Sequence, residues 1–191
     1  MQYKTQKQYR LKGFDYSDIG EYFITICTNN RIHYFGEIVD NVMNISDIGK
    51  IANKIWDEIP NTFENVKLDV NQIMPEHFHA ILAITKRTSK NLNYEITKNG
   101  FLNNKIFKSR IKNNPMELNG ISLGYIIRWF KGRVKYEVKK IRPDFKWQSR
   151  YNDKIIRNEK EYYFIREYIV NNPINWDKKI LDEYFKKNPD I

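Results

Sequence analysis

Two histidines spaced one residue apart are the strongest candidates for chemistry in this sequence. His77 and His79 flank Phe78 inside the apolar segment 73–84, and they are two of the three histidines in the chain. Because side chains alternate between faces along a strand, a strand here would point both imidazoles to the same side. Neutral imidazole is a common metal ligand. The pair therefore indicates a candidate metal site, and the alternative is two hydrogen-bonded histidines in a half-buried sheet.

A tyrosine and an asparagine near the end of the chain form a second candidate pair. Tyr168 and Asn172 are four residues apart, so on a helix they would lie on one face, a turn from each other. A metal held by two imidazoles and an amide oxygen could polarise a phosphate oxygen while a phenol attacks phosphorus. That chemistry cuts a phosphodiester and conserves it as a tyrosine ester. The alternative is a half-buried tyrosine followed by a helix-terminating Asn-Pro pair.

The segments that must position these residues predict an α+β domain with an antiparallel sheet and helices on one face of it. β-branched and aromatic residues predict strands at 22–28, 35–39, 66–73 and 77–84, and an edge strand or extended segment at 145–156. Apolar residues at helical spacing predict helices at 47–59, 123–140 and 158–171, and a short one at about 178–185. Ser46 and Ser122 are the expected N-caps of the first two helices.

Composition narrows the class of partner and of compartment. The 191 residues carry 33 Lys and Arg against 23 Asp and Glu, and 15% are aromatic, which favours a polyanionic partner such as DNA. The alternative is a Lys, Asn and Ile bias from an AT-rich gene. The single Cys27 excludes an intrachain disulfide and fits a reducing compartment. With no run of membrane-spanning length, we expect one soluble, cytoplasmic domain over residues 1–191 and no membrane partner.

Basic residues concentrate in two parts of the chain. On the predicted helix 123–140, Glu137 is the only acidic residue between Leu123 and Arg142, so one face would present cations to phosphates. The segment 86–119 is rich in Asn and Lys and is expected to be a polar, basic insertion, either solvated or in contact with DNA. Residues 174–191 are expected to form a short C-terminal tail.

Several separated motifs give the chain a resemblance to a known family. They are residues 10–16 (RLKGFDY), 22–28 (YFITICT), 74–79 (MPEHFH), 123–131 (LGYIIRWFK), 147–153 (WQSRYND), 155–159 (IIRNE) and 166–169 (REYI) with 172–173 (NP). In this order the chain resembles, over nearly its whole length, the single-tyrosine HUH transposases. Within them it is most similar to the REP-associated tyrosine transposases of bacteria.

The resemblance implies a fold and a set of roles. It implies a ferredoxin-like (RRM-like) sheet with the histidine pair on a central strand and Tyr168 on a C-terminal helix. His77 and His79 would bind Mg²⁺ or Mn²⁺, and Asn172 stands where related enzymes place a third ligand. Tyr168 would cleave single-stranded DNA, leaving a 5′-phosphotyrosine and a free 3′-hydroxyl. Glu76 stands where many relatives carry Asn, and it could accept a hydrogen bond from a ligand imidazole or be a solvated turn residue.

Other residues complete these expectations. Tyr151 is the rival nucleophile, whereas Tyr162 and Tyr163 are expected to pack. The expected partner is single-stranded DNA with hairpins, such as REP-like or transposon-end palindromes in a bacterial nucleoid. The residues predicted to bind it are Lys12, Arg128, Lys131, Lys135, Lys139, Arg150 and Arg157.

Three functions follow as hypotheses. The leading one is a metal-dependent single-stranded DNA endonuclease and strand transferase that cleaves near hairpins. The second is a hairpin DNA-binding protein of the same fold without significant catalysis. The third is a metal hydrolase that uses activated water, for which Glu76 is the only obvious general base. The sequence leaves open whether the protein is a monomer or a homodimer.

Overall fold

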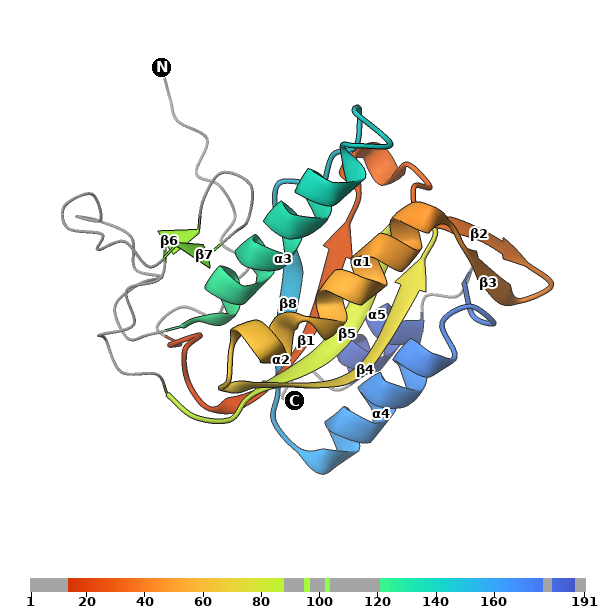
Figure 1. Cartoon of the computed structure of the whole chain (residues 1–191). Helices are drawn as coiled ribbons and strands as arrows, with labels where there is room; N and C mark the ends of the chain where they lie inside the picture. Colours follow the sequence, from red (N-terminus) through yellow and green to blue (C-terminus); the bar gives the residue numbers. More distant parts are fainter. Residues whose placement is uncertain (1–13, 88–94, 97–101, 104–120, 177–179, 188–191) are drawn as a thin grey trace, which may run out of the picture.

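An antiparallel four-stranded sheet organises the computed structural model of this protein (Figure 1). The structure describes residues 14–87, 95–96, 102–103, 121–176 and 180–187. The sheet has the order β4-β5-β1-β8, formed by β4 (Val66–Met74), β5 (His77–Ile84), β1 (Gly20–Cys27) and β8 (Asn152–Ile156). The histidine pair therefore begins one of the two inner strands, and β8 is an edge strand, as the sequence predicted for this segment.

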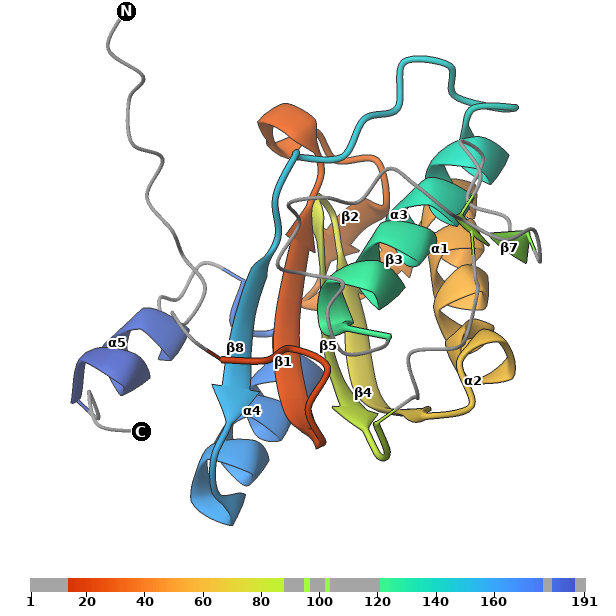
Figure 2. The same cartoon turned by 90° about the vertical axis from the view of Figure 1, so that its left-hand side faces the viewer.

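Helices cover both faces of the sheet (Figure 2). On one face lie α1 (Asp47–Asp57) and α3 (Leu123–Val138), and on the other lies α4 (Glu159–Val170). The predicted α+β class with an antiparallel sheet is confirmed. The prediction that helices lie on one face only is wrong, because alternate positions of the inner strands are apolar toward both sides and each side requires a cover.

The face beneath α1 and α3 holds the larger core. Phe78 of β5 packs against Trp56 of α1 with ring centroids 4.9 Å apart, and Trp56 packs edge-on against Phe130 of α3 at 5.1 Å. All three side chains are fully buried. Interlocking aromatic rings of this kind contribute both buried area and preferred geometry. This core fixes the twist and register of the strands that carry the histidines.

The face beneath α4 holds a much smaller apolar cluster. Phe23 of β1 and Ile81 of β5 contact Ile165 and Ile169 of α4. The two isoleucines are four residues apart, so they form one stripe on the helix. A short stripe therefore suffices to dock α4, and it sets how that helix presents its neighbouring residues to the sheet.

Polar caps begin the three long helices. The Ser46 side chain accepts a hydrogen bond from the Gly49 amide before α1, and Ser122 accepts one from the Tyr125 amide before α3. Asn158 does the same for Glu161 before α4. These caps satisfy amides that have no partner within the helix. Both caps predicted from the sequence are confirmed.

A separate hairpin projects beside the main sheet. It is formed by β2 (Gly36–Val39) and β3 (Val42–Ile45), which pair only with each other. The two residues between them, Asp40 and Asn41, have φ values of 51° and 63°, as a type I′ turn requires. The sequence predicted β2 but missed β3, whose four residues include only short runs of apolar side chains.

Short elements complete the described chain. They are η1 (Asn29–Arg31), α2 (Ile59–Thr62), β6 (Glu95–Ile96), β7 (Leu102–Asn103) and α5 (Ile180–Lys187). The last matches the short helix predicted at about 178–185. Most of the predicted insertion at 86–119 lies outside the described residues, apart from its ends and the paired strands β6 and β7. Among the described helices, none has the length and apolar character needed to span a bilayer.

Candidate active site

The two histidines meet at their Nε2 atoms. His77 and His79 point to the same face of β5, as their spacing predicted, and this is the face covered by α4. Their Nε2 atoms lie 2.9 Å apart. Both side chains are buried, with exposed fractions of 8% and 4%. The rings are nearly perpendicular, at 73°. This arrangement aims one nitrogen of each ring at a common point.

The other nitrogen of each ring has a polar partner. The Nδ1 atom of His77 lies 3.0 Å from Oε1 of Glu76, and Nδ1 of His79 lies 2.9 Å from the hydroxyl of Thr25 on β1. An N–H at Nδ1 of His77 that donates to the carboxylate leaves a lone pair on its Nε2. A threonine hydroxyl both donates and accepts, so Thr25 suits either tautomer of His79. Both rings can therefore offer a lone pair at Nε2.

Burial and charge set the protonation of this group. Burial and the neighbouring His77 lower the pKa of His79 well below its usual value, so its ring is neutral at pH 7. For Glu76, burial acts to raise the pKa, but the hydrogen bond with His77 and the charge of Arg31 outweigh it and lower the pKa. A neutral imidazole and an ionised carboxylate are the forms required for a ligand and its hydrogen-bonded support.

Tyr168 contacts the histidine pair from α4. Its hydroxyl lies 3.4 Å from Nε2 of His79, and the two rings have centroids 5.4 Å apart. The Phe23 ring stacks on the His79 ring and contacts the Tyr168 ring edge-on. The position of Tyr168 follows from Ile165 and Ile169, which dock the same turns of α4 on the sheet. A phenol and two imidazoles from separate parts of the chain therefore converge.

The other candidate tyrosines lie elsewhere. Tyr151, the rival nucleophile, packs on the core beneath α1 and α3, across the sheet from the histidines. The Tyr162 hydroxyl donates to Asp69 at 2.6 Å, and that bond together with burial raises the pKa of Tyr162 to about 12. Tyr163 is 64% exposed. Of these residues, Tyr168 is the one whose hydroxyl contacts an imidazole.

Asn172 follows Asn171, the C-cap of α4, and is buried, with 4% exposed. Its backbone amide donates to the carbonyl of Ile169, which continues the helical turn that began at Tyr168. Within the described residues, its carboxamide makes no hydrogen bond to His77 or His79. The structure therefore places Asn172 near the end of the tyrosine helix without joining it to the imidazoles, and its role as a metal ligand stays a prediction.

The two Nε2 atoms suit two neighbouring ligand positions of a divalent metal site. Ligands at right angles around an octahedral Mg²⁺-sized ion, each about 2.1 Å away, lie about 3 Å apart. The Nε2 atoms of His77 and His79 have this spacing, at 2.9 Å. In the described part of the chain, no cluster of three or more His, Cys, Asp or Glu is positioned to hold a metal. A cation here would need oxygen ligands from an amide, water or a phosphate, which is usual for Mg²⁺ at phosphate-processing sites.

The predicted DNA-binding residues are divided between regions. Arg128 and Lys135 are exposed on α3 and Lys139 at its C-cap, across the sheet from Tyr168. Arg150 is exposed in the segment before β8, and Arg157 is exposed after β8, at the end of the sheet away from His77. Lys12 lies outside the described residues. The predicted cations thus do not form a single surface around the histidines.

Lys131 differs from its neighbours on α3. Its ammonium donates to the carbonyl of Gln148 at 2.7 Å and to that of Ser149 at 3.4 Å, and burial lowers the pKa of Lys131 to about 8. The amide of Gln148 in turn donates to the carbonyl of Cys27, which pairs with His77. The segment around Gln148 therefore links the basic helix to the end of the sheet where the histidines lie.

Three residues near the histidines were not predicted from the sequence. Arg31 lies 3.5 Å from Glu76 Oε1, and the Nε2 of His33 lies 3.8 Å from Glu76 Oε2. Trp176 stacks on His77 with centroids 5.6 Å apart and an interplanar angle of 8°. His33 could have been recognised from the sequence as a candidate site residue, because it is the third histidine of the chain. Nothing in the local pattern around Trp176 pointed to the site.

Comparisons with known proteins place the chain in context. No family model matches it. It is 34% identical over 177 residues to an uncharacterized protein of Haemophilus influenzae, with 92% of each chain covered. Its fold is similar to the structure of the REP-associated tyrosine transposase bound to a REP hairpin, with a TM-score of 0.56 and 15% identity. That match covers 90% of this chain and 75% of the other, and it shows a shared fold.

Proposed function

Because the chain belongs to the same family as the Haemophilus influenzae protein and shares the fold of a REP-associated tyrosine transposase, we propose that it is a metal-dependent single-stranded DNA endonuclease and strand transferase. The observation that supports this most strongly is the convergence of Tyr168, His79 and His77 on one face of the sheet. Since the structural neighbour was solved with a REP hairpin, we propose hairpin-bearing single-stranded DNA as the substrate. Membership of the REP-associated group is part of the proposal.

Tyr168 is the proposed nucleophile. Its ring is held between the sheet and α4 by Phe23 and His79, which limits the directions in which the hydroxyl can point. The phenol oxygen would form a bond to phosphorus, and the bond from phosphorus to the 3′-oxygen would break. The phenol thereby loses its proton and the 3′-oxygen gains one. The products are a 5′-phosphotyrosine and a free 3′-hydroxyl, and the ester can be attacked by the 3′-hydroxyl of another strand.

His77 and His79 are the proposed metal ligands, with Asn172 as a proposed third. When bound there, Mg²⁺ or Mn²⁺ would supply positive charge to a non-bridging oxygen of the scissile phosphate. Glu76 and Thr25 hold the imidazoles in position through their Nδ1 atoms. Because outer hydrogen bonds of this kind fix the ring orientation and the tautomer, both residues are proposed to position the ligands.

A covalent-adduct assay tests the mechanism. The protein is incubated with 3′-labelled hairpin-bearing single strands and Mn²⁺, and the products are separated under denaturing conditions. We expect label on the protein, because the tyrosine keeps the 3′ fragment. Tyr168→Phe is expected to give no adduct, whereas Tyr151→Phe and Tyr163→Phe, the matched controls, are expected to retain it. An adduct formed by Tyr168→Phe, or none formed by the unmodified protein, contradicts the assignment.

A hairpin-binding protein without significant catalysis is the second candidate. It is favoured by the direct contact between the two Nε2 atoms and, among the described residues, by the lack of a third His, Cys, Asp or Glu positioned with them to hold a metal. It predicts tight, salt-dependent hairpin binding whose affinity does not change with Mn²⁺, and no adduct. Binding measured with and without Mn²⁺ beside the adduct assay distinguishes the two functions.

A further inference from the structure

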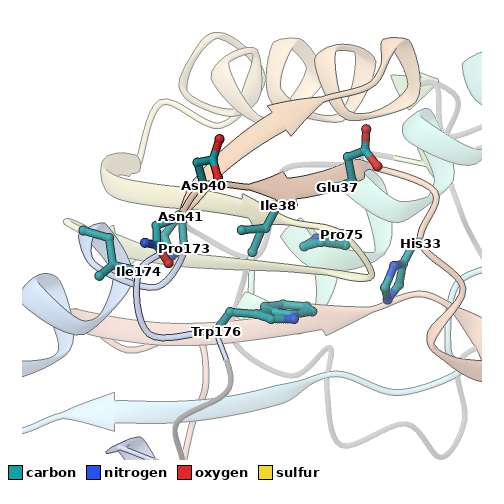
Figure 3. Close-up of a pocket in the computed structure, with 9 residues that line it drawn as sticks. All are labelled: His33, Glu37, Ile38, Asp40, Asn41, Pro75, Pro173, Ile174 and Trp176. Carbon is teal, nitrogen blue, oxygen red and sulfur yellow. The ribbon is translucent and has the colours of Figure 1, made fainter.

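A pocket of about 530 Å³ lies beside the histidine pair, between the β2–β3 hairpin, the β4–β5 turn and the segment after α4 (Figure 3). Ile38 and Pro75 lie on one side of it, and the indole of Trp176 lies on the other. His33 stands at one end, and Asn41 stands with Pro173 at the opposite end. Pockets of roughly this volume, with apolar walls and a few polar groups, hold small molecules or parts of larger ones.

The pocket shares residues with the candidate active site. Trp176 lines the pocket and stacks on His77, and His33 lines it and approaches Glu76, the hydrogen-bond partner of His77. Tyr168 contacts the pair through His79. Successive contacts therefore run from Tyr168 to His79, to His77 and to Trp176 of the pocket. A phosphate held at the histidines would place an adjoining nucleotide at Trp176.

The chemistry of the walls fits a flat aromatic ring with polar edges. An indole opposite an isoleucine and a proline forms a slot for a planar group, and every nucleobase can stack on an aromatic side chain. The Asn41 amide offers a donor and an acceptor together, a combination that asparagine uses to read the edge of a base. The His33 imidazole can donate or accept at the other end. Glu37 and Asp40, also at the pocket, disfavour a phosphate inside it.

We propose that this pocket holds one nucleobase of the bound DNA strand, from a nucleotide next to the scissile phosphate. The base stacks on Trp176, and Asn41 and His33 read its edge. The pocket therefore sets the sequence preference of the strand beside the cleavage position. This inference rests on the proposed function, because it assumes that the strand passes the histidine pair.

A double-mutant cycle between protein and DNA tests the stacking contact. Hairpin oligonucleotides carry one abasic site, moved through the single-stranded flanks, and they are bound to Tyr168→Phe protein so that cleavage does not interfere. At one position the abasic site is expected to weaken binding about 5- to 100-fold, the range for one stacked base. With the abasic site at that position, adding Trp176→Ala should not weaken binding further. With intact DNA, Trp176→Ala should weaken binding by a similar factor. Trp176→Phe, which keeps a ring, is the matched control.

Two variants of Asn41 test the proposed contact between its amide and the edge of the base. Asn41 has a φ of 63°, so Asn41→Gly removes the amide without straining the turn, and Asn41→Asp replaces its donor by a second acceptor. At the position found above, we expect the preference among the four bases to weaken in Asn41→Gly, where His33 remains, and the preferred base to change in Asn41→Asp. The proposal is overturned if the losses of affinity caused by Trp176→Ala and by the abasic site multiply at every position of the strand. It is also overturned if both Asn41 variants keep the base preference of the unmodified protein.

A second measurement separates this proposal from the proposed function. Tryptophan fluorescence of the unmodified protein and of Trp176→Phe is titrated with the four deoxynucleoside monophosphates. Quenching that requires Trp176 supports the pocket even if no DNA adduct forms, in which case the catalytic proposal fails alone. A protein that forms the adduct but shows neither Trp176-dependent quenching nor a sensitive strand position retains the catalytic proposal and loses the pocket.

Discussion

The two faces of strand β5 differ in what their side chains contact. Toward α1 and α3, Phe78, Ala80 and Leu82 are buried in a large core that includes interlocked aromatic rings. Toward α4, His77 and His79 have hydrogen-bond partners on Glu76 and Thr25, and their rings pack on aromatic side chains of a much smaller cluster. One strand thus contributes to the larger core on one face and carries the buried polar pair on the other.

This difference indicates that one face of β5 stabilises the sheet while the other carries the candidate site residues. The larger core packs against the strands that carry the histidines, so we expect the positions of His77 and His79 to depend mainly on that core. The tyrosine helix is held by Ile165 and Ile169 and by a polar contact in which Tyr162 and Arg166 both bind Asp69. Elements with few buried contacts open most easily. Tyr168, the proposed nucleophile, therefore lies on the layer with the smaller apolar contact.

Replacing a histidine should produce the largest effect and leave the core intact. For His77→Ala or His79→Ala we expect Mn²⁺-dependent adduct formation to fall about 1,000-fold or more, since metal charge stabilisation contributes several kcal/mol. The melting temperature should change little, because the larger core is untouched. The rate of adduct formation and thermal unfolding are measured on the same preparations. A folded variant with full activity would remove the metal from the mechanism.

Replacing Phe78, which lies between the two histidines, should destabilise the fold and leave metal binding intact. Phe78 is fully buried against Trp56 and Phe130, so Phe78→Ala is expected to lower the free energy of unfolding by about 3–5 kcal/mol. Mn²⁺ affinity of the remaining folded protein should be unchanged. Urea unfolding and metal titration measure the two quantities. If Phe78→Ala weakens metal binding as strongly as His77→Ala does, the faces are not independent.

Removing the hydrogen bond between Thr25 and His79 should have an intermediate effect on metal affinity. Thr25→Val keeps the shape of the side chain but removes the hydroxyl beside Nδ1 of His79, and we expect Mn²⁺ affinity to fall about 10- to 100-fold. Thr85→Val is the control, because the Thr85 hydroxyl bonds to the carbonyl of Asn65 at the far end of the sheet. Isothermal titration with Mn²⁺ compares the variants. Equal losses in both would show a general effect on folding.

The smallest expected effect concerns the pH dependence of DNA binding on the α3 side. With a pKa of about 8, Lys131 is charged below that pH and neutral above it, so affinity for single-stranded DNA should weaken as pH rises through 8. The loss should be at most about five-fold, the scale of one exposed ion pair. Lys131→Arg, which stays charged, should flatten this part of the profile. An unchanged profile would mean that Lys131 serves only the carbonyls of Gln148 and Ser149.

Much of the fold could be predicted because its signals are local. The strand with the histidines has the predicted bounds, and the capping serines mark the starts of α1 and α3. Alternation along a strand was enough to place His77 and His79 on one face. The missed hairpin strand β3 is short, and its pairing depends on a two-residue turn instead of a long apolar pattern.

By itself the sequence determined the strand and helix periods, the shared direction of the two imidazoles and the candidate residues, because these depend on neighbours along the chain. Only the tertiary structure decided that Tyr168 contacts His79 while Tyr151 lies across the sheet. It also decided that the exposed cations of α3 lie on the opposite face and that Trp176 stacks on His77. These relations depend on strand order and on which face each helix covers, which are set by contacts between residues far apart in the sequence.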